Sequence, residues 1–242
     1  MEETYNKRCS VVMATYNGEK YIKEQIDSIL QNMTTDDELI ISDDGSTDST
    51  LQIISDFNDK RIKVIEGPHN GVKQNFANAI QNTSGKYIFL SDQDDIWMKN
   101  KIESVLDKFE NSNVSVVIHD AEVINEKLEV TIPSFFEYRN SGKGIIKNIY
   151  KNTYIGCCMA FKSELKENIL PIPNDIEMHD QWIGIIGELI GNGSLFLKEH
   201  LIKYRRHSNN VSQMKHYGII KMIKNRLFFI KNLVIRRLRR KK

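Results

Sequence analysis

Two aspartates spaced two residues apart are the strongest chemical signal in the sequence. Asp92 and Asp94 lie in the segment SDQDDIW, directly after the apolar run 86–90. Carboxylates at this spacing suit Mg²⁺ or Mn²⁺, which keep several waters and bind substrate phosphates through one or two carboxylates. A turn that caps the next helix needs one aspartate, whereas this segment holds three, so the pattern favours a metal site. An EF-hand calcium loop is excluded, because Trp97 occupies the position that requires glycine.

Polar side chains also follow two earlier apolar runs. Asp43 and Asp44 come directly after the run 38–42, and the segment 15–17 (Thr-Tyr-Asn) ends the run 9–15. Ligands of open parallel sheets bind at the carboxyl ends of strands, so we expect these groups to meet there. The carboxylates of segments 43–44 and 92–95 would raise one another's pKa unless a cation or hydrogen-bond donors joined them. The pair Asp43-Asp44 fits either a strand end with a helix cap or a contact to a nucleotide.

The elements that position these residues alternate in the first half of the chain. Apolar runs predict strands at 9–15, 38–42, 61–65 and 86–90. Helical spacing predicts helices at 19–31, 46–57 and 72–80, with Ser46 or Thr47 as the cap of the second. Strands separated by such helices imply right-handed crossovers and a mostly parallel sheet covered by helices.

The second half of the chain is less regular. We expect strands at 115–118, 157–161 and 194–205, and a short helix at 180–190. The sequence shows no internal repeat and no low-complexity linker. We therefore predict one α/β domain over residues 1–212, followed by a separate helical segment at 213–242.

Composition and short motifs exclude several classes of protein. Neither a Walker A loop nor a GxGxxG motif occurs, which argues against P-loop and Rossmann nucleotide binding. Cys9, Cys157 and Cys158 lack the spacing of a zinc site, so we expect reduced thiols inside apolar strands. The first ten residues are polar, and no run approaches the roughly 18 apolar residues of a membrane-spanning helix. We expect an intracellular protein that does not span a membrane.

Several motifs, taken in order, resemble glycosyltransferase family 2, whose members are inverting enzymes with the GT-A fold. The matching segments are ATYNGEKYI (14–22), ISDDGSTDST (41–50), HNGVKQNFANAI (69–80), KYIFLSDQDDIW (86–97), HDQW (179–182) and YRRHSNNVS (204–212). One such motif alone is a weak signal, whereas this order is specific. The resemblance implies a GT-A type mostly parallel sheet flanked by helices, and a nucleotide-diphosphate sugar as donor.

The resemblance also implies a role for each matched residue. Asp94, the second acid of the DxD motif, would hold Mn²⁺ or Mg²⁺ on the donor diphosphate, and His207 would contact the metal or a phosphate. Asp180 would be the catalytic base, and His179 replaces the glutamate that usually precedes it. The donor would contact Thr15, Tyr16, Asn17, Glu19, Asp44 (at the base), Lys73, Asn75, Asp92 and Gln93. The acceptor would contact Trp97, Gly156, Cys157 and His179.

These roles agree with the chemistry of glycosyl transfer. Breaking the bond between the sugar and the diphosphate puts negative charge on the departing phosphates, which a divalent cation stabilises. A carboxylate can take the proton of the attacking hydroxyl, so one base opposite the leaving group gives direct displacement with inversion. From the residues alone, Asp180 could instead cap the apolar helix that follows it. His207 could equally be a structural histidine.

The sequence gives less support to three other functions. A sugar-1-phosphate nucleotidyltransferase needs a glycine-rich, arginine-bearing loop after the first strand, and ATYNGEK holds one glycine. A non-catalytic binding or scaffold module would not need the intact Asp92, Asp94 and Asp180. A glycoside hydrolase would have no use for a DxD motif. SDQDDIW together with HDQW resembles the subgroup that includes rhamnosyltransferases, so dTDP-rhamnose is the leading donor and UDP-hexoses come next.

The C-terminal segment is basic and amphipathic. Residues 215–242 hold eleven Lys or Arg and no Asp or Glu, so the rest of the chain is acidic. Apolar residues share one side of a helical wheel here: Ile219, Ile223, Leu227, Ile230 and Val234, flanked by Met222, Phe229 and Leu233. Such a helix lies in the interface of an anionic membrane, or else packs on the domain or in a homo-oligomer. The acidic body argues against nucleic acid as a partner. We expect a peripheral protein on the inner face of the cell membrane, with a saccharide or lipid-linked saccharide as acceptor.

Overall fold

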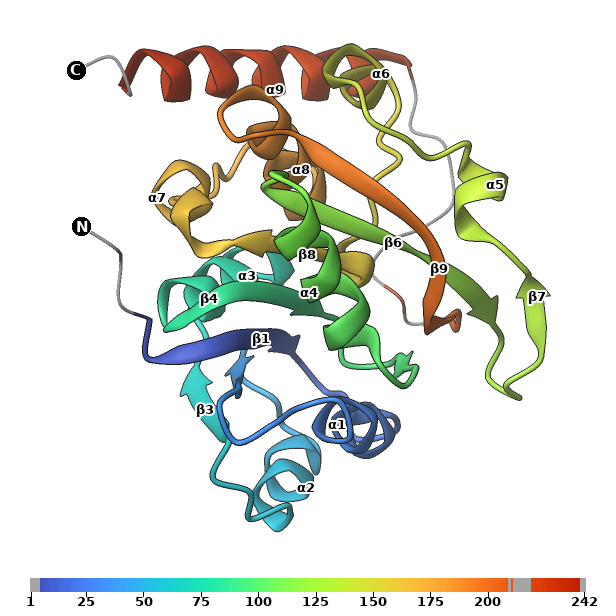
Figure 1. Cartoon of the computed structure of the whole chain (residues 1–242). Helices are drawn as coiled ribbons and strands as arrows, with labels where there is room; N and C mark the ends of the chain where they lie inside the picture. Colours follow the sequence, from blue (N-terminus) through green and yellow to red (C-terminus); the bar gives the residue numbers. More distant parts are fainter. Residues whose placement is uncertain (1–4, 209, 211–218, 240–242) are drawn as a thin grey trace.

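The parallel half of the sheet forms from four apolar strands that alternate with helices, as the sequence predicts. The computed structural model describes residues 5–208, 210 and 219–239 (Figure 1). The elements in chain order are β1 (Lys7–Thr15), α1 (Ile22–Leu30), β2 (Glu38–Asp43), α2 (Thr50–Asp56), β3 (Ile62–Glu66), α3 (Val72–Gln81) and β4 (Gly85–Ser91). Strands β3, β2, β1 and β4 lie side by side in this order and all run parallel.

Strand register brings the predicted polar segments to one edge. Thr15 at the end of β1 lies opposite Asp43 of β2, and Met13 lies opposite Ser91 of β4. The segments 15–17, 43–44 and 92–95 therefore leave the sheet beside one another. This is the carboxyl edge at which parallel sheets bind ligands.

The second half of the chain extends the same sheet with mixed strand directions. Its elements are β5 (Ile96–Trp97), α4 (Lys101–Asn111), β6 (Val116–Ile124), β7 (Val130–Ile132), α5 (Phe135–Arg139), α6 (Ile145–Tyr150), β8 (Met159–Lys162), α7 (Lys166–Ile169), α8 (His179–Leu189) and β9 (Ser194–Arg205). Strand β8 joins β4 to β6 and is antiparallel to both, whereas β9 runs parallel to β6. Strand β5 pairs with the far end of β9, which brings Arg205 beside the loop after β4.

Side chains from both halves form one hydrophobic core. Helix α3 packs on β1 and β2, and α8 packs on β6. The α8 contact is close at Gly187, where a Cβ atom would lie 2.2 Å from Cγ2 of Val116. A larger residue at this position would separate the helix from the sheet.

Two local predictions differ from the structure. Helix α2 begins at Thr50 rather than at 46 or 47, because the Asp43 carboxylate accepts hydrogen bonds from the Gly45 and Ser46 backbone and from the Ser46 hydroxyl. These bonds hold residues 45–46 in a turn. The strand predicted at 157–161 is shorter, because Gly156–Cys158 forms a 3₁₀ turn before β8. The three cysteines are buried and free, as expected, but only Cys9 lies in a strand, since Cys157 and Cys158 belong to this turn.

The C-terminal helix α9 (Ile219–Arg239) lies across α8 and beside α6 (Figure 1). Phe229 and Leu233 are buried, with the Phe229 ring 5.8 Å from that of Trp182 in α8. Residues 211–218, which include the end of the motif YRRHSNNVS and the start of the helical segment predicted at 213–242, lie outside the described residues. Within the described part of the chain, no helix combines the length and the apolar character needed to cross a bilayer.

Candidate active site

A pocket of about 920 Å³ opens at the carboxyl edge of the parallel strands. Its walls come from the loops after β1, β2 and β4, the segment before α8, and the segment that follows β9. Most of the residues that the sequence nominated line this pocket: Thr15, Tyr16, Asn17, Asp44, Asn75, Asp92, Gln93, Asp94, Gly156, His179, Asp180 and His207. Segments far apart in the sequence thus meet at one cavity.

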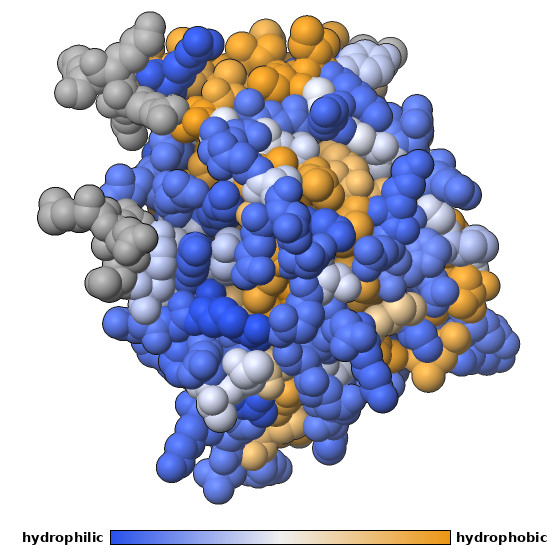
Figure 2. Space-filling model, viewed as in Figure 1, coloured by the Kyte–Doolittle hydropathy of each residue, from blue (hydrophilic) through white to orange (hydrophobic). Residues whose placement is uncertain are grey.

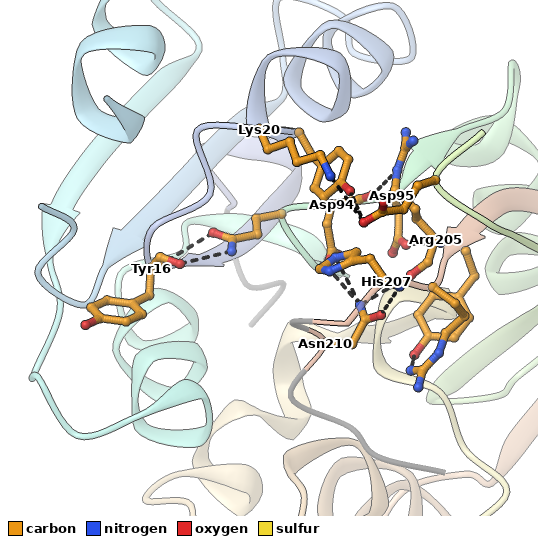
Figure 3. A network of polar contacts seen from close by, with 12 residues as sticks. Tyr16, Lys20, Asp94, Asp95, Arg205, His207 and Asn210 are labelled. Atoms are coloured by element: carbon orange, nitrogen blue, oxygen red, sulfur yellow. Dashed lines mark hydrogen bonds and ion pairs between the residues drawn. The ribbon is translucent and has the colours of Figure 1, made fainter. Parts of the chain in front are cut away.

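One wall of the pocket carries polar side chains that are held in place by hydrogen bonds to the backbone. The Asp44 carboxylate accepts hydrogen bonds from the backbone N–H groups of Asn70 (3.3 Å) and Gly71 (2.8 Å). The Gln93 side chain binds both the N–H and the carbonyl of Tyr16, which leaves the Tyr16 ring exposed at the pocket (Figure 3). This wall presents an aromatic face and a fixed carboxylate, as a planar heterocyclic base would require.

A second wall places Asp94 against residues from the end of the domain. The Asp94 Oδ2 atom lies 2.8 Å from Nε2 of His207 and 3.0 Å from Nδ2 of Asn210 (Figure 3). Behind them, the buried Arg205 donates through Nε to the Asp94 carbonyl, and its backbone N–H donates to the Asp95 carboxylate. Arg205 therefore fixes the loop that carries the acidic residues.

The remaining carboxylates of this loop form an inner group. Ligand atoms of Asp92, Asp95 and Cys157 lie within 4.8 Å of one another. Burial and the nearby Asp94 and Asp180 carboxylates raise the pKa of Asp92 to about 7. Burial and the charges of Asp94 and Asp92 also raise the pKa of Asp95. Negative charge is thus concentrated at this end of the pocket.

This group of side chains fits a divalent cation. Asp94 and His207 bring a carboxylate oxygen and an imidazole nitrogen together, which is a ligand set for Mn²⁺ and, through the carboxylates, for Mg²⁺. A cation here would favour the ionised form of Asp92, whose pKa is raised first by burial and then by the neighbouring carboxylates. Cys157 is a poor ligand, because burial raises the pKa of its thiol well above the usual value.

Asp180 lines the same pocket from the first turn of α8. It is buried, and burial raises the pKa of its carboxyl to about 6, although hydrogen bonds from the backbone of Gln181 and the side chain of Asn152 lower it. A carboxylate with a pKa close to neutrality is ionised at pH 7 and still accepts a proton readily. These are the properties of a general base.

His179 lies beside Asp180 and stacks on Phe76, with the two ring centroids 4.1 Å apart. Neither ring nitrogen has a hydrogen-bond partner among the described residues, although the side chain is buried at the pocket wall. Burial and the charge of Lys73 lower the pKa of His179 to about 3, so the imidazole is neutral. A Cβ atom at Gly156 would lie 3.0 Å from its Nε2 atom, so a residue larger than glycine would press against the ring.

The model of glycosyl transferase family 2 matches residues 10–170, which is more than half of the chain. The chain belongs to glycosyl transferase family 2. The resemblance seen in the motifs is therefore confirmed, and this glycosyltransferase uses a nucleotide-sugar donor.

Two curated relatives illustrate the range of the family. The glycosyltransferase is 30% identical over 217 residues to the dTDP-rhamnosyl transferase RfbG of Shigella flexneri, covering 82% of this chain and 72% of the relative. It is 27% identical over 212 residues to the UDP-Glc:alpha-D-GlcNAc-diphosphoundecaprenol beta-1,3-glucosyltransferase WfgD of Escherichia coli, covering 85% of this chain and 82% of the relative.

Solved structures confirm the predicted fold. The S. aureus TarS 1-349 structure in complex with UDP-GlcNAc aligns with a TM-score of 0.74 at 20% identity, covering 93% of this chain and 67% of that one. The mannosyltransferase PcManGT from Pyrobaculum calidifontis, in complex with GDP-Man and Mn²⁺, aligns with a TM-score of 0.64 at 17% identity, covering 85% of this chain and 59% of that one. The curled, mainly parallel sheet flanked by helices is thus the GT-A architecture.

Four nominated residues lie outside the pocket of the glycosyltransferase, because their side chains are bound elsewhere. Glu19 accepts the backbone N–H of Ser49 at the start of α2. Lys73 donates to the carbonyls of Asn174 and Ile176. Two more are buried in the core: Trp97, whose ring lies 3.8 Å from the Lys101 ammonium, and Cys157, whose carbonyl accepts from that ammonium.

Other residues of the glycosyltransferase site were not anticipated. Arg139 and Asn152 line the pocket beside Asp180, and Arg139 donates to the Asn152 carbonyl at 3.0 Å. They lie in the segment 133–153, which carries no strong periodic pattern or motif. Asn210 could have been found, because it lies three residues after His207 inside the motif YRRHSNNVS.

Proposed function

We propose that residues 1–212 catalyse a metal-dependent, single transfer of a sugar from a nucleoside-diphosphate donor to a saccharide hydroxyl, with inversion at the anomeric carbon. One observation carries this proposal. The carboxylate suited to a metal, Asp94, and the carboxylate suited to a general base, Asp180, line the same pocket. A donor bound between them would meet both groups.

The nucleotide would bind at the wall formed by the loops after β1 and β2. Tyr16 offers a ring for the base, and Asp44 offers an acceptor for a base N–H or a ribose hydroxyl. Thr15 and Asn75 support this wall from below: the Asn75 amide donates to the Ser42 carbonyl at 2.7 Å and to the Thr15 carbonyl at 3.3 Å. dTDP-rhamnose is the leading donor and a UDP-hexose the next, which the names of the two relatives support.

Mn²⁺ or Mg²⁺ would be held by Asp94 and His207, with Asp92 close by. When bound, the ion supplies Lewis-acid stabilisation of the departing diphosphate. The named Mn²⁺ complex of the mannosyltransferase supports a metal in this fold. The chain's own contribution is to hold these ligands in place, through Arg205 and the Asn210 amide.

Asp180 would remove the proton of the acceptor hydroxyl. The hydroxyl oxygen forms a bond to the anomeric carbon while the bond from that carbon to the phosphate oxygen breaks. The proton passes to Asp180, and the nucleoside diphosphate leaves with the electron pair. Attack from the face opposite the leaving group inverts the anomeric centre, and no covalent enzyme intermediate is required.

The acceptor would enter from the side of α8. Gly156 and His179 line this side of the pocket together, and a residue larger than glycine at 156 would displace the His179 ring. The WfgD relative is named for a diphosphoundecaprenol-linked acceptor, which supports a lipid-linked saccharide as the substrate here and a role in cell-surface polysaccharide synthesis.

The test is release of nucleoside diphosphate from a panel of dTDP-rhamnose, UDP-glucose and other UDP-hexoses, with Mn²⁺ or Mg²⁺ and with EDTA. We expect turnover of one donor that EDTA abolishes and that Asp94→Asn lowers by about 10² or more. Asp56→Asn, the same change at an exposed position of α2, should leave turnover unchanged. Absence of both turnover and binding for every donor would overturn the proposal.

A further inference from the structure

Helix α9 uses only one of its two apolar faces to dock on the domain. Phe229 and Leu233 are buried against the domain, and the side chain of Asn232 donates to Asp175 at 2.6 Å. Arg236 donates to the carbonyls of Leu170 and Pro171. The helix is thus fixed along its length by both packing and polar contacts.

The other face of α9 carries a continuous apolar stripe that faces solvent. Its five residues recur every three or four positions and are each between 45% and 62% exposed: Ile223, Leu227, Ile230, Val234 and Leu238. This spacing places them on one side of a helix. The orange patch at the top of Figure 2 lies over α9 as drawn in Figure 1. A stripe of this length on a docked helix marks an interaction surface.

Helix α6 extends this apolar surface. Ile146 and Tyr150 are 85% and 71% exposed. Arg226 of α9 donates to the Tyr150 carbonyl at 2.6 Å and lies over the Tyr150 ring, so the two helices are joined side by side. The surface therefore has the breadth of two helices rather than of one.

The charged residues beside the apolar stripe indicate which partner the stripe would bind. Exposed cations flank it on both sides, Lys224 and Lys231 on one and Arg237 on the other, and residues 219–239 contain no Asp or Glu. A second copy of the helix would bring cations against cations. An anionic bilayer offers apolar tails to the stripe and negative headgroups to its flanks.

We propose that α9 and α6 form a membrane-binding surface that places the stripe at the interface of an anionic bilayer, with α9 lying parallel to the membrane plane. The surface is part of the folded domain, not a detachable tail. Trp182 contacts α9 and follows Asp180 by two residues in α8, so the pocket wall that carries the base is joined directly to this surface. An acceptor held in the membrane would then approach the pocket from the α8 side.

The test is sedimentation of the full-length chain with vesicles of phosphatidylcholine alone and with added phosphatidylglycerol. Leu227→Asp with Val234→Asp adds two charges to the stripe, and Leu51→Asp with Val130→Asp adds the same charges at exposed apolar positions of α2 and β7. Deleting the helix is a poorer experiment, because it would uncover Trp182. Donor turnover of each variant checks that the domain is folded.

We expect the stripe variant to bind anionic vesicles at least about tenfold more weakly, while the control variant binds like the wild type. Lys224→Gln with Lys231→Gln should weaken binding to anionic vesicles by roughly fivefold for each lysine and should not change binding to neutral ones. Equal binding by the stripe variant and the wild type would overturn the proposal. So would a wild-type dimer that the stripe variant converts to a monomer while vesicle binding persists, since a second copy would then cover the stripe.

Discussion

Replacing Asp180 with asparagine tests the general base without changing the shape of the pocket wall. The asparagine Oδ1 can still accept hydrogen bonds from the Gln181 backbone and the Asn152 amide, as the aspartate does. The variant should therefore fold and bind donor like the wild type. It lacks the carboxylate that we propose as the base, so we expect kcat to fall by about 10²–10⁴ with little change in the KM for the donor.

The pKa of Asp180 sets the pH range over which the wild type should work. Burial raises this pKa to about 6, and a carboxyl group acts as a general base only in its charged form. Activity should therefore be present above pH 6 and be lost as the pH falls through 6, by about tenfold for each unit below it. The ionisable groups that surround Asp180 are Asp92, Glu177, Arg139 and Tyr154.

The assay is kcat/KM for donor turnover from pH 4.5 to pH 8.5, at a fixed concentration of free metal. Without metal the pKa of Asp92 is also raised, to about 7, so a second variant is needed to assign the loss of activity at low pH to Asp180. Glu177 raises the pKa of Asp180. In Glu177→Gln the fall in kcat/KM at low pH should therefore begin at a lower pH, while kcat/KM at neutral pH should stay as in the wild type. A flat pH profile, or an Asp180→Asn variant that keeps a tenth of the wild-type kcat, would refute this assignment.

Three further predictions follow from the contacts around the site. Asn152→Ala removes a hydrogen bond that lowers the pKa of Asp180. The fall in kcat/KM at low pH should therefore begin at a higher pH than in the wild type. A pH profile identical to that of the wild type would contradict this. Arg205→Gln removes a buried guanidinium that fixes the loop carrying Asp94, the proposed metal ligand. It should lower the free energy of unfolding in urea by about 2 kcal/mol and weaken Mn²⁺ binding by calorimetry; an equal Mn²⁺ affinity would argue against a positioning role. Gly187→Ala places a methyl group against Val116 and should lower the unfolding midpoint by an amount equivalent to about 1–3 kcal/mol, whereas an unchanged midpoint would show that α8 can shift.

The parallel half of the fold was predictable because its signals are local. Strands β1, β2 and β4 are continuous apolar runs, and the helices between them have clear apolar spacing. The second half depends on contacts distant in sequence. Strand β8 has four residues, and nothing within them indicates that they pair antiparallel with both β4 and β6.

The candidate site was predictable where a motif carried it. Asp92, Asp94, Asp180 and His207 were nominated from short segments and meet at one pocket. Glu19 was nominated from the same motifs, but its carboxylate binds the start of α2, since an unpaired backbone N–H there needs an acceptor. Residues such as Arg139 are recognised only when the fold brings their segments to the pocket.

The C-terminal helix shows why amphipathic patterns leave alternatives open. Its apolar residues cover more than one face, and the sequence cannot say which face meets the domain. In the structure Phe229 and Leu233 are buried, whereas Leu227 and Val234 face solvent. Packing on the domain and binding a membrane are therefore compatible in one helix.

The most direct test of the account is to locate the metal and the nucleotide by diffraction. Crystals soaked with Mn²⁺ and the nucleoside diphosphate of the preferred donor would be measured at the manganese absorption edge. We expect an anomalous peak in contact with Asp94 and His207, with the diphosphate beside it and Asp180 facing the same cavity. A peak held by the group Asp92, Asp95 and Cys157 without Asp94, or a nucleotide bound outside this pocket, would contradict it.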